Sequence, residues 1–150
     1  MRALLFLLVL SASSTVAHHA DFSSTTLMEQ QDGTWLLQVK AALATFEYTQ
    51  PPGSFQTPDA FKNLILAHLA RHISIRCNGT TTATLEAGSM RLGPESTVLF
   101  RVIGIPPVLH NIEVSNSSFQ NLYQHLIALI VLPQGVAQQQ FVLIKNILYT

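Results

Sequence analysis

Apolar and polar residues alternate along much of this chain, and that period of two constrains its fold more than any other feature. In the segment TWLLQVKAALATF, one face would carry the apolar side chains of Trp35, Leu37, Val39, Ala41 and Leu43. Because successive side chains of a strand point to opposite faces, this pattern is typical of a half-buried strand. The same alternation is present at 22–28, 73–77, 98–102 and 108–114.

Two continuous apolar runs lie near the C-terminus, HLIALIVL at 125–132 and QFVLIKNIL at 140–148. Each is too short to cross a bilayer as a helix, which takes about 20 residues. A short apolar run is typical of a strand that is covered on both faces. We therefore expect the two runs to pair as a hairpin.

One segment changes the period from two to that of a helix. In TPDAFKNLILAHLARH, Thr57 can act as the N-cap, Pro58 fits the first helical position and Asp59 suits the positive end of the helix dipole. The apolar residues that follow share one stripe at helical spacing: Phe61, Leu64, Ile65 and Leu69. This pattern predicts a helix over about 58–71.

The dipeptide Asn78-Gly79 follows the alternating stretch ISIRC and indicates a turn. A two-residue loop would put the apolar residues that follow on the wrong face of the hairpin. A three-residue loop, Cys77-Asn78-Gly79, pairs Ile75 with Thr81 and keeps the apolar residues on one face. It also requires a left-handed backbone at Gly79.

Cys77 is the only cysteine, so the chain can form no internal disulfide and must rely on its core. The alternation places Cys77 on the apolar side of a strand, as a buried and inert side chain. The three-residue loop would instead place it in the turn. No activating partner is marked nearby in the sequence, so a catalytic thiol is not predicted.

Together these patterns predict about eight strands and one helix. Many short strands separated by turn signals favour a mainly β fold. We expect an immunoglobulin-like β-sandwich of about eight strands, with the helix at about 58–71 inserted across an edge or an open end. The length fits a single domain over 18–150.

The N-terminus has the three-part layout of a secretory signal peptide. Arg2 is its basic residue, the apolar run ALLFLLVL follows, and Thr15 and Ala17 are small residues at the −3 and −1 positions of the cleavage site. Residues 1–17 are therefore interpreted as a signal peptide, with a cut after Ser14 as the alternative. The mature protein is expected to be periplasmic or secreted, without a transmembrane segment.

The charge of the chain argues against some partners. Without Arg2 the chain has seven basic residues (eight minus one) and eight acidic ones, so its net charge is about −1 with histidine neutral. No basic patch is present, so binding to nucleic acid or to an anionic membrane is not predicted. With 11% charged residues, the domain can fill a core and still expose an apolar face.

Several stretches of the chain together resemble a known family. They are a His start of the mature chain, then DFSSTTL, a helix that ends in LARHISIRCNG, and the terminal QQQFVLIKN. This order resembles a family of short exported bacterial proteins classed as a domain of unknown function, over nearly the whole mature chain. The sequence departs from the family at ATFEYTQPPG, where an acidic stretch is common and only Glu47 remains. The resemblance implies an envelope location and a β-rich fold, and no activity.

Four histidines are candidates for a metal site. A cut after Ala17 would leave His18 and His19 at the mature N-terminus, where His18 carries both an α-amine and an imidazole. These nitrogens suit Cu(II) or zinc, and a third ligand could come from His110 or His125. The alternative is that the two N-terminal histidines are solvated and merely follow the cleavage site.

No catalytic motif is present in the sequence. HLARH places His68 and His72 on one helix face, but it lacks the glutamate of the zinc-enzyme motif. Imidazoles near a helix C-terminus are also favourable without any metal. The patterns G-x-S-x-G and C-x-x-C and a Gly-rich phosphate loop are absent. We therefore predict no enzymatic activity, no catalytic or cofactor-binding residues and no cofactor.

Two functional hypotheses remain. The first is a non-catalytic binding or accessory module that contacts a protein partner in the bacterial cell envelope. The second is a periplasmic copper- or zinc-binding protein that uses the N-terminal His18.

Overall fold

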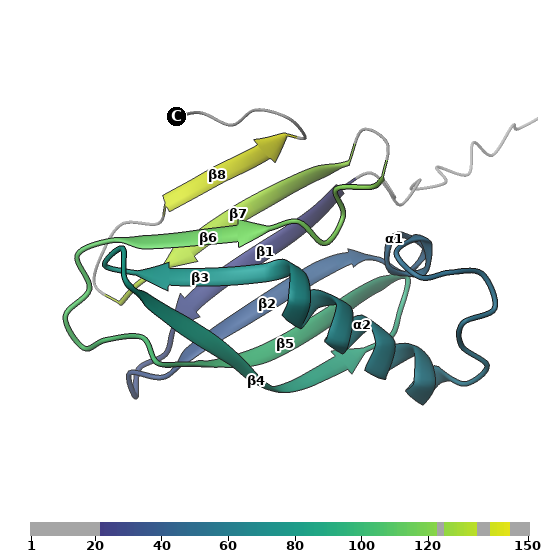
Figure 1. The fold of residues 1–150 in the computed structure, drawn as a ribbon, viewed down its shortest axis with the longest axis horizontal. Coiled ribbons are helices and arrows are strands. Elements are labelled where there is room, and N and C mark those ends of the chain that lie inside the picture. Colours follow the sequence, from purple (N-terminus) through teal and green to yellow (C-terminus); the bar gives the residue numbers. More distant parts are fainter. Residues whose placement is uncertain (1–21, 123–124, 135–138, 145–150) are drawn as a thin grey trace, which may run out of the picture.

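The computed structural model describes residues 22–122, 125–134 and 139–144 (Figure 1). The elements in this part of the chain are, in order, β1 (Phe22–Glu29), β2 (Trp35–Ala42), α1 (Leu43–Tyr48), α2 (Pro58–His72), β3 (Ile73–Cys77), β4 (Thr81–Arg91), β5 (Glu95–Ile103), β6 (Ile112–Asn116), β7 (Leu126–Leu132) and β8 (Gln139–Ile144). The prediction of a mainly β fold with about eight strands is confirmed, and the one predicted helix is α2, to which the structure adds α1. None of the helices in the described ranges has the length and hydropathy needed to span a bilayer.

The strands of the described chain form one hydrogen-bonded sheet in the order β6-β3-β4-β5-β2-β1-β7-β8. Neighbouring strands are antiparallel, except that β1 and β7 are parallel. The predicted hairpin of the two C-terminal apolar runs is confirmed, because β7 pairs with β8.

The single sheet corrects the expected immunoglobulin-like sandwich of two separate sheets. A register shift between Glu86 and Ser89 marks a bulge in β4, and a bulge bends its strand and increases the local twist. Beyond it, β3 crosses in front of β1 in Figure 1, and Asn116 Nδ2 of β6 donates to Thr25 Oγ1 of β1 at 2.8 Å. One curled sheet therefore supplies both layers of the core.

Helix α2 confirms the predicted helix and its N-cap. The backbone N–H of Ala60 donates to Thr57 Oγ1 at 3.2 Å, and Pro58 occupies the first turn. Phe61, Ile65 and Leu69 are buried on one stripe, and the helix packs against β3 and β4.

The core lies inside the curled sheet and includes buried side chains of α1 and α2. The predicted inward face of β2 is confirmed over Trp35, Leu37, Val39 and Ala41, which are all buried. The inward face of β1, in contrast, is largely polar, and its fully buried residues are Ser23, Thr25 and Leu27.

The sequence does not predict helix α1, because the alternation of apolar residues continues to Leu43. The pairing of β2 with β5 ends at Ala42 and Glu95, and Pro94 precedes that last pair. The N–H of Leu43 donates to the carbonyl of Pro94 at 3.1 Å. Without a partner strand beyond this point the backbone bonds internally as a helix, and Phe46 is buried against Phe119.

The three-residue length of the β3–β4 loop is confirmed, but its position is wrong by one residue. Cys77 pairs with Thr81 and Ile75 with Ala83, so the loop runs from Asn78 to Thr80. Both Asn78 (φ 52°) and Gly79 (φ 72°) have positive φ, as a type I′ turn requires. Cys77 therefore ends β3 and is fully buried, which settles the two interpretations of that residue.

Candidate functional site

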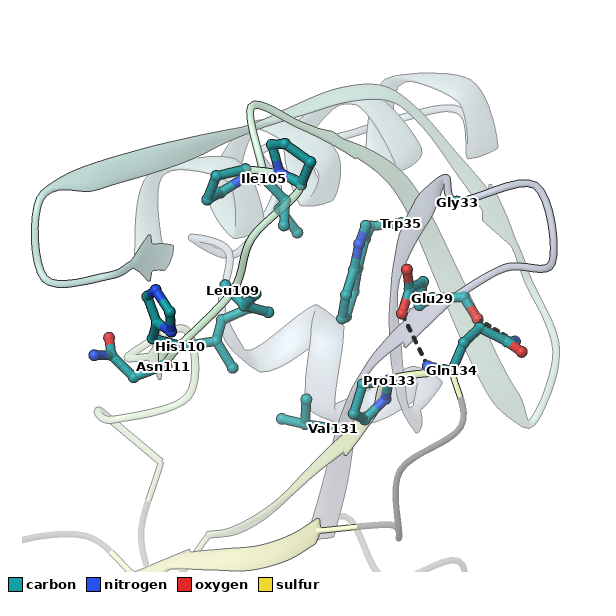
Figure 2. Close-up of a pocket in the computed structure, with 13 residues that line it drawn as sticks. Glu29, Gly33, Trp35, Ile105, Leu109, His110, Asn111, Val131, Pro133 and Gln134 are labelled. Atoms are coloured by element: carbon teal, nitrogen blue, oxygen red, sulfur yellow. Dashed lines mark hydrogen bonds between the residues drawn. The ribbon is translucent and has the colours of Figure 1, made fainter.

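A hollow of about 770 Å³ opens at the end of the curled sheet (Figure 2). The β1–β2 turn, the β5–β6 connection and the end of β7 meet there. Its lining residues are Glu29, Gly33, Trp35, Ile105, Pro106, Pro107, Leu109, His110, Asn111, Ile112, Val131, Pro133 and Gln134. The volume lies within the range of roughly 300–1,000 Å³ that is typical of ligand sites.

Most of the hollow is apolar. Figure 2 shows the indole of Trp35 at its centre, with Leu109 on the facing wall and Val131 and Pro133 beside it. Trp35 is only 7% exposed, so its ring forms part of the core and only a small area of it is accessible. Trp35 is also the only tryptophan of the chain, and its fluorescence can therefore report on the hollow.

The rim of the hollow is polar. Gln134 donates its backbone N–H to Glu29 Oε2 at 2.9 Å and its side-chain Nε2 to the Glu29 carbonyl at 3.0 Å, which joins the residue after β7 to β1. His110 and Asn111 lie on the opposite side in Figure 2. Glu29 is the only Asp, Glu, Lys or Arg among the described lining residues, so the rim carries one negative charge.

The side chain of Asn78 holds the wall formed by the β5–β6 connection. Its Nδ2 donates to the Val108 carbonyl at 2.9 Å, and its Oδ1 accepts the N–H of His110 at 2.8 Å and of Asn111 at 3.3 Å. These bonds satisfy the backbone outside a strand, so the predicted strand is present as β6 but begins at Ile112 and not at Val108. The sequence indicated Asn78 as a turn residue, but no local signal indicated this second role.

We expect Asn78→Gly to lower the free energy of unfolding by roughly 1–3 kcal/mol, because it removes three hydrogen bonds while tolerating the positive φ. Urea denaturation measures the change. The control Asn78→Asp keeps the acceptor for His110 and loses only the donor to Val108, so its loss should be smaller. The prediction is wrong if the glycine variant unfolds at the same urea concentration as the parent protein.

Of the four predicted metal-ligating histidines, the structure describes His110 and His125, and it places these two in different parts of the fold. His18 and His19 lie outside the described residues. His110 is exposed at the rim of the hollow, across from Glu29, whereas His125 is buried beside Ser23. The hollow lies at the Glu29 end of β1, and Ser23 lies at the other end of that strand, roughly 20 Å away at about 3.3 Å per residue. Within the described ranges, no three His, Cys, Asp or Glu side chains are placed to share a metal ion.

His68 and His72 share one face of α2, as predicted, and both bond to backbone carbonyls. His68 Nε2 donates to the Ser118 carbonyl at 2.8 Å, and His72 Nδ1 donates to the His68 carbonyl at 2.7 Å. The two rings are 4.3 Å apart between centroids. Ser117 N–H in turn donates to the His72 carbonyl at 2.9 Å. Through these hydrogen bonds the β6–β7 connection is bound to the C-terminal end of α2.

Burial lowers the pKa of His68 below its ordinary value of 6.5, and the positive charges of His72 and Arg71 also lower it, although the bond to Ser118 opposes the shift. The folded protein therefore binds this proton less readily than the unfolded chain. The contribution of neutral His68 to the free energy of unfolding should therefore be fully present above about pH 6.5. It should be lost as the pH falls from there through the lower pKa that His68 has in the folded protein.

We expect His68→Gln to make the melting temperature less dependent on pH between about pH 7 and pH 5, because glutamine can still donate to Ser118 but does not titrate. Thermal denaturation followed by circular dichroism measures this. The exposed His110 gives a matched control, His110→Gln, which should keep the dependence of the parent. Equal pH dependence in the parent and in His68→Gln would contradict the assignment.

Ser23 and Cys77 are buried side chains whose groups could in principle act as nucleophiles. Ser23 Oγ lies 2.9 Å from His125 Nε2, a distance typical of a nucleophile and its base. Ser23 is 0% exposed, however, so no substrate can reach its hydroxyl in this conformation. Cys77 is also 0% exposed, and burial raises the pKa of its thiol, which therefore stays protonated. No local sequence signal indicated the Ser23–His125 contact, because 102 positions separate the two residues.

No protein-family model matches this sequence, and no curated protein matches it either. The resemblance to short exported bacterial proteins therefore stays a prediction.

Proposed function

We propose that this protein is a non-catalytic binding module of the bacterial cell envelope, and that it holds an apolar part of a partner protein in the hollow beside Trp35. The hollow is the observation that carries the proposal. Its walls are apolar, its rim supplies a few polar groups, and such a combination is typical of sites that bind by shape and apolar contact. The predicted signal peptide supports the envelope location.

The chemistry of the walls favours an aliphatic or aromatic group as the occupant. Transfer of one leucine-sized side chain from water to such a site contributes about 1.5–3 kcal/mol. The polar rim would fix the orientation of the occupant, through Glu29, His110 and Asn111. No described residue of the hollow is a cysteine, serine or threonine, so its lining has no thiol or aliphatic hydroxyl group.

Titration with the neutral apolar dye Nile red tests whether the hollow takes an apolar ligand. Binding should change the fluorescence of Trp35 and of the dye together. Leu109→Lys should weaken binding by at least about tenfold, because it places a charge on the apolar wall. Val108→Lys is the matched control, since Val108 is the adjacent residue, is 62% exposed and does not line the hollow.

Equal dye affinity of both lysine variants, at unchanged melting temperatures, would place the dye elsewhere and would contradict the proposal. The alternative function, copper or zinc binding through the N-terminal His18, remains a separate prediction. None of the contacts within the described ranges favours it.

A further inference from the structure

Strand β6 is one edge of the sheet among the described residues, and the backbone groups of its alternate residues point away from its neighbour β3. It pairs with β3 alone in the part of the chain that the structure describes. Asn78 N donates to the Asn111 carbonyl at 3.0 Å and Ser117 N to the His72 carbonyl at 2.9 Å. These two bonds fix which pairs of the antiparallel ladder are hydrogen-bonded, because such pairs alternate along it.

The alternation makes Ser74–Ser115 and Arg76–Glu113 the bonded pairs. Ile112 and Val114 are the residues between them, so their N–H and C=O groups point to the free edge. No hydrogen bond to these groups is found within the described ranges. The edge therefore presents a short row of backbone donors and acceptors that matches an incoming strand.

The inward side chains of the same strand are incompletely covered. Ile112 lies opposite Cys77 and Val114 opposite Ile75, so these pairs share the core face of the sheet. Cys77 and Ile75 are 0% and 1% exposed, whereas Ile112 and Val114 are only half-buried. The difference shows that the core is covered on the β3 side and incomplete on the free side of β6.

The free edge of β6 continues into the hollow. Ile112 lines it from the start of β6, and Val131 lines it from the end of β7. The hollow thus lies in the seam between the edge strand and β7, and the indole of Trp35 is at its centre in Figure 2. An extended chain in this seam could bond to the backbone of β6 and place every second side chain over the hollow.

We propose that the partner binds by strand addition, with an extended segment that pairs with the free edge of β6 at Ile112 and Val114 and inserts an apolar side chain into the hollow. This inference rests on the function proposed above and names the form of the partner. The segment would have apolar side chains at alternate positions, facing the core. The single negative charge of the rim, on Glu29, favours a basic residue at that end of the segment.

A second copy of this chain is the weaker occupant. β6 has five residues and is about 17 Å long at 3.3 Å per residue. Pairing of two such edges falls short of the roughly 800 Å² per partner that a stable interface buries. A peptide that also fills the hollow gains the apolar contacts that edge pairing lacks.

The test uses a short synthetic probe peptide, free of tryptophan, in which valine and threonine alternate after a leading arginine. Its binding to the parent protein is followed by the fluorescence of Trp35 and by displacement of Nile red. A second peptide has the same sequence with alternate backbone nitrogens methylated, so that it keeps the side chains and loses the donors on one edge. We expect the first peptide to bind and the methylated one to bind at least about tenfold more weakly, a difference of about 1.4 kcal/mol.

The matching change in the protein is Val114→Pro. It removes the free-edge donor of Val114 without touching the ladder to β3, and proline is tolerated on such an edge. We expect at least about a tenfold loss of probe affinity, whereas the control Val114→Ala, which keeps the N–H, should lose less than about threefold. Circular dichroism and melting temperature check the fold of both variants. If Val114→Pro does not fold, the comparison of the methylated and unmethylated peptides on the parent protein tests the proposal.

The outcomes separate this inference from the proposed function. If Nile red binds in the hollow but the probe peptide does not displace it at any concentration, strand addition is overturned and the apolar site remains. Equal affinities of the two peptides, or equal affinity of the parent and a folded Val114→Pro, also overturn it. A dimer in sedimentation that Val114→Pro abolishes would assign the edge to a second copy of the chain instead. If neither Nile red nor the peptide binds, both proposals fail.

Discussion

Replacement of Phe119 by alanine should lower the free energy of unfolding by about 3–5 kcal/mol. Phe119 lies in the β6–β7 connection and is 1% exposed. Its ring meets Phe46 of α1 in an edge-on contact, with 5.7 Å between centroids, and lies 4.8 Å from the ring of His125. Truncation would leave a cavity between a helix, a connection and the start of β7, and these rigid elements cannot easily collapse into it.

Urea denaturation of the parent and of Phe119→Ala measures this loss. Phe22→Ala is the matched control, because Phe22 is 47% exposed and the same side-chain atoms are removed. The control should change stability by about 1 kcal/mol or less. A similar loss in the two variants would mean that Phe119 is not part of the core.

Gly88→Ala should lower the free energy of unfolding by about 1–3 kcal/mol, although alanine is ordinarily the better residue in a strand. A Cβ atom on Gly88 would lie 2.6 Å from Phe100 Cε1 and 2.8 Å from Leu66 Cδ2, well inside van der Waals contact. Gly88 lies at the β4 bulge, where α2 crosses the sheet. The absence of a side chain therefore allows Leu66 of the helix and the ring of Phe100 to approach the strand closely.

A double-mutant cycle tests this explanation directly. Phe100→Leu should lower the free energy of unfolding of the parent. In the Gly88→Ala background the same substitution should lower it less, because the smaller side chain relieves the clash. The neighbouring substitution Ser89→Ala is the control for a change in the same bulge, and its effect should be within about 0.5 kcal/mol. Additive effects of the two substitutions in the cycle would show that the close approach to Phe100 does not constrain Gly88.

The same packing shapes the seam that we propose as the binding site. Asn116 bonds to Thr25 and accepts the N–H of Ser118 at 2.9 Å, so the end of β6 is fixed over β1 by a buried polar cluster. The opposite end of β6 is fixed by the side chain of Asn78. Because both ends are held, the free edge of β6 is preorganised, and an added strand would order few protein groups on binding.

The sequence determined the local elements of this protein. Alternation at period two identified β2 and β5 and the face of each that is buried, and the change to helical spacing behind Thr57 identified α2. The turn residue Gly79 was identified with its positive φ. These predictions succeeded because side-chain periodicity, capping and backbone conformation depend on residues that are close in the chain.

Tertiary structure alone decided how those elements are joined. A curled single sheet and a two-sheet sandwich have the same alternation, so only the bulge in β4 and the pairing of distant strands distinguish them. Likewise, β2 gives way to α1 because its partner β5 has ended. The hollow combines residues near 29–35, 105–112 and 131–134, and Asn78 holds its wall across 30 positions. Such contacts depend on which strands meet, and no local pattern encodes that choice.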